Sequence, residues 1–238
     1  MNHKTSFSEA LRSAAIELSP ATVDKLFAYL DLMLQMNQRI NLTAITDYHE
    51  ALYKHIFDSL IILNLPEFSA AASILDIGSG AGFPGIPLAI CFPEKTIVSL
   101  DSTQKKILFQ QQVCQELEIN NLQPVWGRAE EYGRDPAYRE RFDLVTARAV
   151  SAINILLELA IPFCKIEKHA IFYKGKEIRD ELAAAQSTQQ LLSAFSPRTI
   201  DYCLPGSLGD RTLVVFKKLA ATPAQYPRKS GLPQKRPL

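Results

Sequence analysis

The sequence predicts an α/β fold, with a mostly parallel sheet, an antiparallel hairpin at one edge and a helical N-terminal extension. Five short apolar runs alternate with stretches of helical periodicity, two more strand-like runs follow, and the start of the chain shows helical periodicity alone. Strands and helices that alternate at this spacing are typical of parallel βαβ units with right-handed crossovers. At 238 residues the chain is long enough for one large domain, or for one domain with an appendage.

Three helices are expected in the N-terminal extension, residues 1–66. The start of each helix is predicted by a capping residue: Ser6, Ser19 or Asp47. Ser19 is followed by a proline, which favours the first helical position. The third helix is expected to end near Leu63, and a polar segment connects it to the second.

The predicted sheet domain covers residues 67–218. Its strands are expected at 73–76, 96–101, 122–126, 142–146, 170–173, 198–204 and 211–217. Helices are expected in the intervening stretches, at about 84–92, 103–118, 151–161 and 176–192. Because the loop 205–210 is short and rich in turn residues, the last two strands are predicted to pair as the antiparallel hairpin.

Composition excludes several classes of protein. With 47% hydrophobic and 21% charged residues, the chain has the composition of a soluble globular protein. No apolar run reaches the roughly 18 residues of a membrane span, and the first residues do not resemble a signal peptide. The four cysteines are scattered, without a CxxC pair. This usage predicts no metal site, no disulfide framework and a cytoplasmic location.

A basic tail is predicted over residues 219–238. From Phe216 to the end the sequence has six basic residues and no acidic one, although the net charge of the whole chain is only +1. A basic segment on a slightly acidic body favours a polyanionic partner. The alternative is a solvated terminus without a partner.

The strongest functional signal is the segment 75–85, LDIGSGAGFPG, at the end of the first predicted strand. Three of its four glycines, Gly78, Gly80 and Gly82, alternate with other residues. Glycines there allow a tight turn and a close approach of the backbone to a ligand. The dinucleotide fingerprint would need a glycine where Phe83 stands, which disfavours a nicotinamide-dependent oxidoreductase. Asp76 precedes the glycines, and its carboxylate can accept bonds from an ammonium group but would repel a pyrophosphate. The alternative is a purely structural turn.

Three further loops at the predicted carboxyl ends of strands carry candidate ligand contacts. Asp101, after the second strand, can bind both hydroxyls of a ribose, or is an ordinary acid at a strand end. The loop 127–131 can contact an adenine edge, or is a charged turn. Arg148, after the fourth strand, can hold a carboxylate or a phosphate. Its alternative is an ion pair within the fold, to Asp143 or Glu131.

Together these motifs resemble those of a known family. DIGSGAGFPG, GRAEE and the RAV that follows FDLVTA look like the motifs of a class I S-adenosylmethionine-dependent methyltransferase. RINLTAI, HIFDS, YKGK and the tail YPRKSGLP are more specifically similar to the ribosomal small-subunit methyltransferase G family, also called glucose-inhibited division protein B. The resemblance extends over nearly the whole chain. It implies a Rossmann-like fold with a seven-stranded sheet, and S-adenosyl-L-methionine as the cofactor. The implied substrate is a guanosine of 16S rRNA, position 527 in the usual rRNA numbering, methylated at N7.

The resemblance also implies roles for particular residues. The implied cofactor contacts are Gly78, Phe83, Asp101, Ala129, Glu130 and Arg148, beside the glycine-loop residues Asp76, Gly80 and Gly82. Asp101 would bind the ribose. Ala129 and Glu130 would frame the adenine, and Arg148 would lie beside the methionine end.

Methylation at N7 is consistent with the absence of certain residue types from the predicted site. Guanine N7 carries a free lone pair and needs no general base, so no catalytic residue is named and Arg148 is considered only for positioning. No Asn/Asp-Pro-Pro motif, as used for exocyclic amines, follows the fourth strand. Cys164 is expected to be a small buried side chain rather than a nucleophile. Two alternatives remain on the same fold: a non-catalytic ribosome-assembly factor and a small-molecule methyltransferase.

Six residues are candidates for contacts with the RNA: Asn41, Thr43, His55, Lys174, Arg228 and Lys229. The first two could instead cap a helix. His55 shares a helix face with Asp58, so its alternative is a local hydrogen-bonded pair. Trp126 and Tyr173 are expected in the core rather than as stacking platforms for bases. The protein is predicted to act as a monomer on the small ribosomal subunit.

Overall fold

The computed structural model describes residues 3–238. Seven strands form one sheet: β1 (Ser73–Ile77), β2 (Thr96–Asp101), β3 (Leu122–Trp126), β4 (Phe142–Arg148), β5 (Cys164–Gly175), β6 (Ala194–Cys203) and β7 (Asp210–Lys218). The strand order is β3-β2-β1-β4-β5-β7-β6. The first five strands pair in parallel, whereas β7 pairs antiparallel with both β5 and β6. The mostly parallel sheet with an antiparallel hairpin at one edge is therefore confirmed.

The N-terminal part of the chain is helical, as predicted. Its elements are α1 (His3–Ser13), α2 (Pro20–Ile40), α3 (Tyr48–Ala51), a π-helix (Leu52–Phe57), α4 (Asp58–Leu60), a 3₁₀ turn (Ile61–Asn64) and α5 (Pro66–Ser69). Within the sheet region lie α6 (Gly85–Cys91), α7 (Gln104–Glu116), α8 (Ala129–Tyr132), α9 (Ile153–Ala160), 3₁₀ turns at Ile161–Phe163 and Pro205–Ser207, α10 (Arg179–Ala184) and α11 (Gln186–Leu192). The last helix is α12 (Leu232–Lys235).

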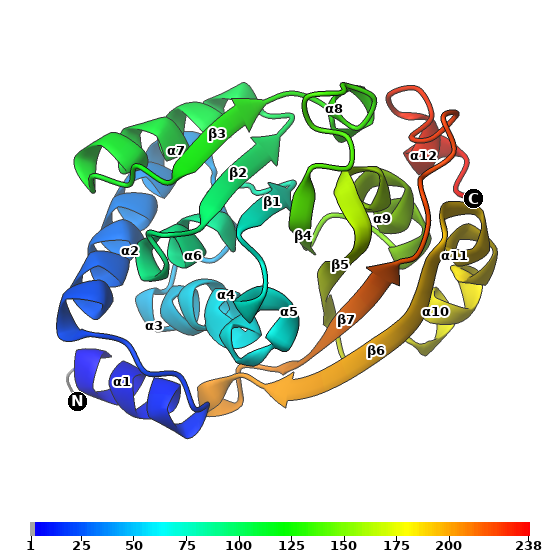
Figure 1. Ribbon diagram of the computed structural model, residues 1–238. Helices are drawn as coiled ribbons and strands as arrows, with labels where there is room; N and C mark the ends of the chain where they lie inside the picture. The colour runs from blue at the N-terminus through cyan, green and yellow to red at the C-terminus, as the bar shows by residue number, and fades with distance from the viewer. Residues whose placement is uncertain (1–2) are drawn as a thin grey trace.

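Helices cover both faces of the sheet (Figure 1). On one face α6 and α7 pack against α2, and on the other lie α9, α10 and α11. The N-terminal helices share one continuous core with the sheet, from Phe7 to Val215. Helices on both faces explain why every residue of the central strands β1 and β4, polar ones included, is buried or half-buried.

The helix starts follow the predicted caps at two of three places. The side chains of Ser19 and Asp47 accept hydrogen bonds from the backbone N–H of Thr22 and Glu50. The prediction at Ser6 is wrong, because α1 already begins at His3. An ion pair between Lys4 and Asp24 (2.6 Å) ties the first turn of α1 to α2.

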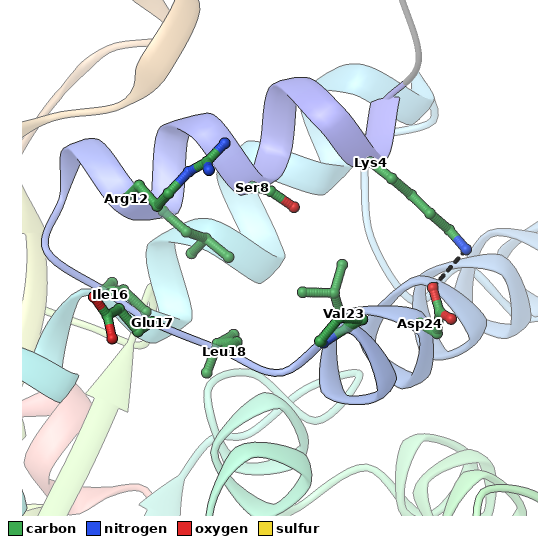
Figure 2. Close-up of a pocket in the computed structure, with 10 residues that line it drawn as sticks. Lys4, Ser8, Arg12, Ile16, Glu17, Leu18, Val23 and Asp24 are labelled. Carbon is green, nitrogen blue, oxygen red and sulfur yellow. Dashed lines mark hydrogen bonds and ion pairs between the residues drawn. The ribbon is translucent and has the colours of Figure 1, made fainter.

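A hollow of about 480 Å³ lies between α1 and the start of α2. Figure 2 shows it, with the ion pair at one end and apolar side chains along its floor. All the residues that line it lie within Lys4–Asp24, so none of the predicted site residues takes part.

The third predicted helix is not a single α-helix. Its segment is continuous from Tyr48 to Asn64, but it widens into the π-helix at Leu52–Phe57. A π-helix displaces backbone carbonyls from the regular ladder and is frequent at functional sites. Here the carbonyls of Lys54 and His55 accept hydrogen bonds from the guanidinium of Arg148, at the end of β4.

The C-terminal segment packs against the body instead of extending into solvent. Tyr226 is buried, and Arg139 donates to the carbonyl oxygens of Thr222 and Tyr226. The carbonyl of Leu238 accepts hydrogen bonds from Asn154 and from a residue of α11. A solvated terminus is therefore the wrong interpretation of this segment.

Two aromatic residues expected in the core differ in their outcome. Tyr173 is buried, as predicted, and its hydroxyl donates to the carbonyl of Ser59. Trp126 is 55% exposed, because it ends the edge strand β3 and its indole N–H donates to the carbonyl of Ser102. Over residues 3–238, no helix is long and apolar enough to span a membrane.

Candidate cofactor and substrate site

The candidate cofactor residues lie together at the carboxyl ends of the parallel strands. The parallel register places Ile77, at the end of β1, level with Leu100 in β2 and Ala147 in β4. Asp101 lies level with Trp126 at the end of β3. The loops that follow these strands therefore lie close together. Open α/β sheets bind ligands at this place, beyond the carboxyl ends of their strands.

The glycine loop has room for a ligand where its backbone turns. Gly78 has a φ of +65°, and a Cβ there would lie 2.6 Å from a methyl group of Val150. Gly80 has a φ of +60°, and beyond its two chain neighbours no heavy atom of the described residues lies within 4 Å of its Cβ position. The first glycine is thus required by the fold, whereas the second leaves an open face that a bound group can approach.

Asp76 lies fully buried beneath this loop. One carboxylate oxygen accepts from the backbone N–H of Gly85 (3.0 Å), and the other from the hydroxyl of Thr146 (3.3 Å). Burial raises the pKa of Asp76 to about 7, although the bond from Gly85 opposes this shift. In this structure Asp76 fixes the turn from β1 into α6.

Two buried polar residues that sequence reasoning missed also hold the loop. The hydroxyl of Tyr29, in α2, donates to the carbonyl of Ala81 (2.8 Å). The amide of Gln110, in α7, donates to the carbonyl of Gly80 (2.8 Å). A sequence signal exists for Gln110, because it stands three residues after the buried Ile107 on the same helix face.

Asp101 is positioned directly beside the glycine loop. One carboxylate oxygen accepts from the backbone N–H of Gly80 (2.8 Å) and the other from that of Thr103 (2.7 Å). Each oxygen keeps a further lone pair. The carboxylate is therefore held in place at the end of β2 and retains acceptor capacity.

The loop after β3 leads into α8, which begins at Ala129. Glu130 is buried, and its carboxylate accepts from the backbone N–H of Gly231 in the C-terminal segment (2.8 Å). The side chain of Glu130 is thus bound to the tail, while the backbone of 129–130 lies at the carboxyl edge of the sheet.

Arg148 connects the sheet with the N-terminal helices. Its guanidinium donates to Asp58 (3.0 Å) and to the carbonyls of Lys54 and His55 (3.1 and 3.3 Å). It also lies over the ring of Phe83, 5.0 Å from the ring centre. An ion pair within the fold does form, but its partner is Asp58 rather than Asp143 or Glu131.

The alternative for His55, a local pair with Asp58, does not form, because Arg148 binds both side chains instead. The imidazole contacts the hydroxyl of Thr43 (2.9 Å) through Nε2 and stacks on Phe83 at 4.7 Å between ring centres. Burial, with the nearby charges of Arg148 and Lys54, lowers the pKa of His55 to about 3. The ring is therefore neutral at physiological pH.

A pocket of about 730 Å³ opens beside Arg148. Its walls include Lys54, His55, Asp58, Arg148, Lys174 and Arg211. The structure thus brings two predicted RNA contacts, His55 and Lys174, to one pocket. Lys174 is paired with Glu181 (2.7 Å).

The other predicted RNA contacts lie elsewhere. Asn41 is exposed and forms the left-handed C-cap of α2. The hydroxyl of Thr43 contacts the imidazole of His55. Arg228 pairs with the buried Glu158 (2.6 Å), whereas Lys229 is exposed.

The sheet order, the glycine loop and the acid at the end of β2 define the class of protein: a class I S-adenosylmethionine-dependent methyltransferase. The fold is similar to that of an O-methyltransferase from Bacillus cereus in complex with SAH. The TM-score is 0.56 with 18% sequence identity, over 80% of this chain and 91% of that one.

Sequence relatives narrow this class to one family. The family model for rRNA small subunit methyltransferase G matches residues 22–205. The ribosomal RNA small subunit methyltransferase G of Brevibacillus brevis is 40% identical over 235 residues, 99% of both chains. The protein of the same name from an Exiguobacterium species is 37% identical over 236 residues, again 99% of both. The chain belongs to this family, and its cofactor is S-adenosylmethionine.

Proposed function

We propose that this protein transfers the methyl group of S-adenosylmethionine to N7 of a guanosine, position 527, in 16S rRNA of the small ribosomal subunit. The observation that carries the proposal is the pocket of about 730 Å³ beside Arg148, because Arg148 and His55 in its walls both contact Phe83 of the glycine loop. Similarity along the full length to methyltransferases of the small subunit rRNA supports the same substrate.

The chain offers suitable groups for each part of the cofactor. The backbone from Gly78 to Phe83 would cradle it, with the open face at Gly80, and Asp101 would accept bonds from the ribose hydroxyls. The backbone of 129–130 would frame the adenine, and Arg148 would lie beside the methionine end. Asp76 contributes through the loop that it holds, since its carboxylate is buried. When bound, the cofactor supplies an activated methyl group on its sulfonium.

The site fits a reaction that needs positioning rather than a base. Both ring nitrogens of His55 are engaged, one by Thr43 and one by Arg148. Cys164 is fully buried, and burial raises the pKa of its thiol to about 12, which argues against a cysteine nucleophile. Guanine N7 needs neither group, because alignment of its lone pair with the methyl group is sufficient.

The two alternatives are less well supported. A non-catalytic assembly factor would not need a glycine loop with an open face at Gly80. A small-molecule methyltransferase would not need an open, cation-rich pocket. A ribosomal substrate implies activity in the cytoplasm. Because one chain supplies every residue of the site, we propose that the monomer is active.

The proposal is tested by methyl transfer from labelled S-adenosylmethionine to small ribosomal subunits that lack the native methylation, followed by mapping of N7-methylguanosine. Label at one guanosine of the decoding-region loop is the expected result. Cofactor binding without any label in the RNA would contradict the rRNA substrate.

A further inference from the structure

The pocket beside Arg148 extends past the carboxyl ends of β4 and β5 to the start of β7, away from the glycine loop. In the register of β4 and β5, Arg148 lies level with Tyr173, and Gly175 at the end of β5 lies level with Arg211 in β7. Because β4 and β5 stand between β1 and β7, Arg211 is three strand spacings, roughly 14 Å, from the strand that carries the glycine loop. This span leaves room for a nucleotide between the methyl donor and Arg211.

Basic residues outnumber acidic ones in the walls of this pocket. Its basic residues are Lys54, Arg148, Lys174, Lys176 and Arg211, against the acidic residues Asp58, Glu177 and Glu181. The carboxylate of Asp58 is already taken, since it accepts from Arg148 and from the hydroxyl of Tyr202. An anionic ligand therefore meets little repulsion at the base of the pocket.

Arg211 differs from the other four cations. Each of those forms an ion pair with a carboxylate. The guanidinium of Arg211 donates only to the backbone carbonyl of Asp210 (3.0 Å), and no acidic side chain of residues 3–238 lies within ion-pair distance of it. Its remaining N–H donors are available to a ligand.

We propose that Arg211 holds a phosphate of the RNA strand next to the target guanosine, while the guanine itself lies in the pocket towards Arg148. This inference rests on the proposed function. The planar fork of an arginine matches two phosphate oxygens at once. Lys176, whose side chain is 72% exposed and paired only with Asp210, stands at the rim and can reach the same strand. A pocket of about 730 Å³ is large enough for a base that has left its stack.

The test compares Arg211→Gln and Arg211→Lys with the unaltered protein, in methyl transfer to undermethylated small subunits. For Arg211→Gln we expect the KM for the subunit to rise about tenfold, the usual effect of losing a hydrogen bond to a charged group, with little change in kcat. The affinity for S-adenosylmethionine should stay the same, which also shows that the variant is folded. Arg211→Lys should restore part of the affinity for the subunit. The slope of log affinity against log salt should become shallower by about 0.7 for Arg211→Gln.

The matched control is Arg12→Gln, in α1 and outside the pocket, which should change neither the KM nor the salt slope. If the unaltered protein methylates the subunit and Arg211→Gln does so with the same KM and slope, the phosphate contact is refuted while the proposed function stands. If the unaltered protein binds cofactor but transfers no methyl group to the subunit, the proposed function fails and the phosphate contact with it.

Discussion

Arg148 donates a hydrogen bond from Nη2 to Nδ1 of His55 at 3.3 Å, and this contact fixes the tautomer of the histidine. An arginine has no acceptor, so Nδ1 must accept, and the proton of the neutral ring lies on Nε2, directed at the hydroxyl of Thr43. Protonation of the ring would place a second positive charge against the guanidinium. The strand β4 and the π-helix are thus joined by a pair that requires a neutral histidine.

This relationship predicts how stability depends on pH. The pKa of His55 is about 3 in the folded protein and about 6.5 in the unfolded chain, so between these values the unfolded state binds more protons. The contribution of His55 to the free energy of unfolding should therefore fall as pH falls from about 6.5 towards 3, by about 1.4 kcal/mol per pH unit. His55→Asn keeps an acceptor for Arg148 but does not titrate, so its advantage over the unaltered protein should grow in acid. Urea unfolding at several pH values measures this, with exposed His49→Asn as the control. Parallel pH profiles for His55→Asn and the unaltered protein would contradict the prediction.

Gly78→Asp should abolish cofactor binding. The new Cβ would stand 2.6 Å from Val150 at a φ of +65°, so the loop that lines the candidate cofactor site would have to shift. We expect at least a hundredfold weaker binding in a calorimetric titration with S-adenosylmethionine. Gly206→Asp is the matched control, since Gly206 also has a positive φ (+70°) but lies in a turn outside the loop. Equal affinities for both variants would refute the assignment of the loop.

Glu158→Ala should destabilise the fold by about 3 kcal/mol, because it leaves the guanidinium of Arg228 without its carboxylate partner. Glu158 is fully buried, and it accepts from the guanidinium and from the backbone N–H of Arg228. Chemical denaturation would measure the loss. Glu167→Ala breaks the exposed pair with Lys217 and should cost less than about 1 kcal/mol. Similar losses for both variants would show that the C-terminal segment adds little to stability.

The basic tail can be tested without removing its structural contacts. Truncation before Tyr226 would also delete Arg228, so substitution of the exposed Lys229, Lys235 and Arg236 by glutamine is the sharper change. We expect the salt slope of RNA binding to become shallower by up to about 2, because each lost phosphate contact on a single strand contributes about 0.7. The melting temperature should stay the same. Filter binding at increasing salt measures the slope, and an unchanged slope would remove these charges from the RNA interface.

The sequence predicted the elements of the sheet well because each carries its own local signal. The β-branched runs, the turn residues before β7 and the cap at Ser19 all act over a few neighbouring residues. The π-helix had no such signal, because a π turn depends on what packs against it. Trp126 was wrongly predicted to be buried for a similar reason. Its strand, β3, lies at the outer edge of the sheet, and the sequence of β3 alone does not reveal the order of the strands.

The sequence by itself determined the α/β class, the glycine loop, the acid at the end of β2 and the family resemblance, because these depend on residue types at short spacing. Only the tertiary structure decided what the long side chains do. Arg148 pairs with Asp58, 90 residues away, and Arg228 with Glu158, 70 residues away. Such pairs form where the chain returns on itself to neutralise a buried charge. Which of several possible carboxylates is close enough depends on packing, which no local pattern records.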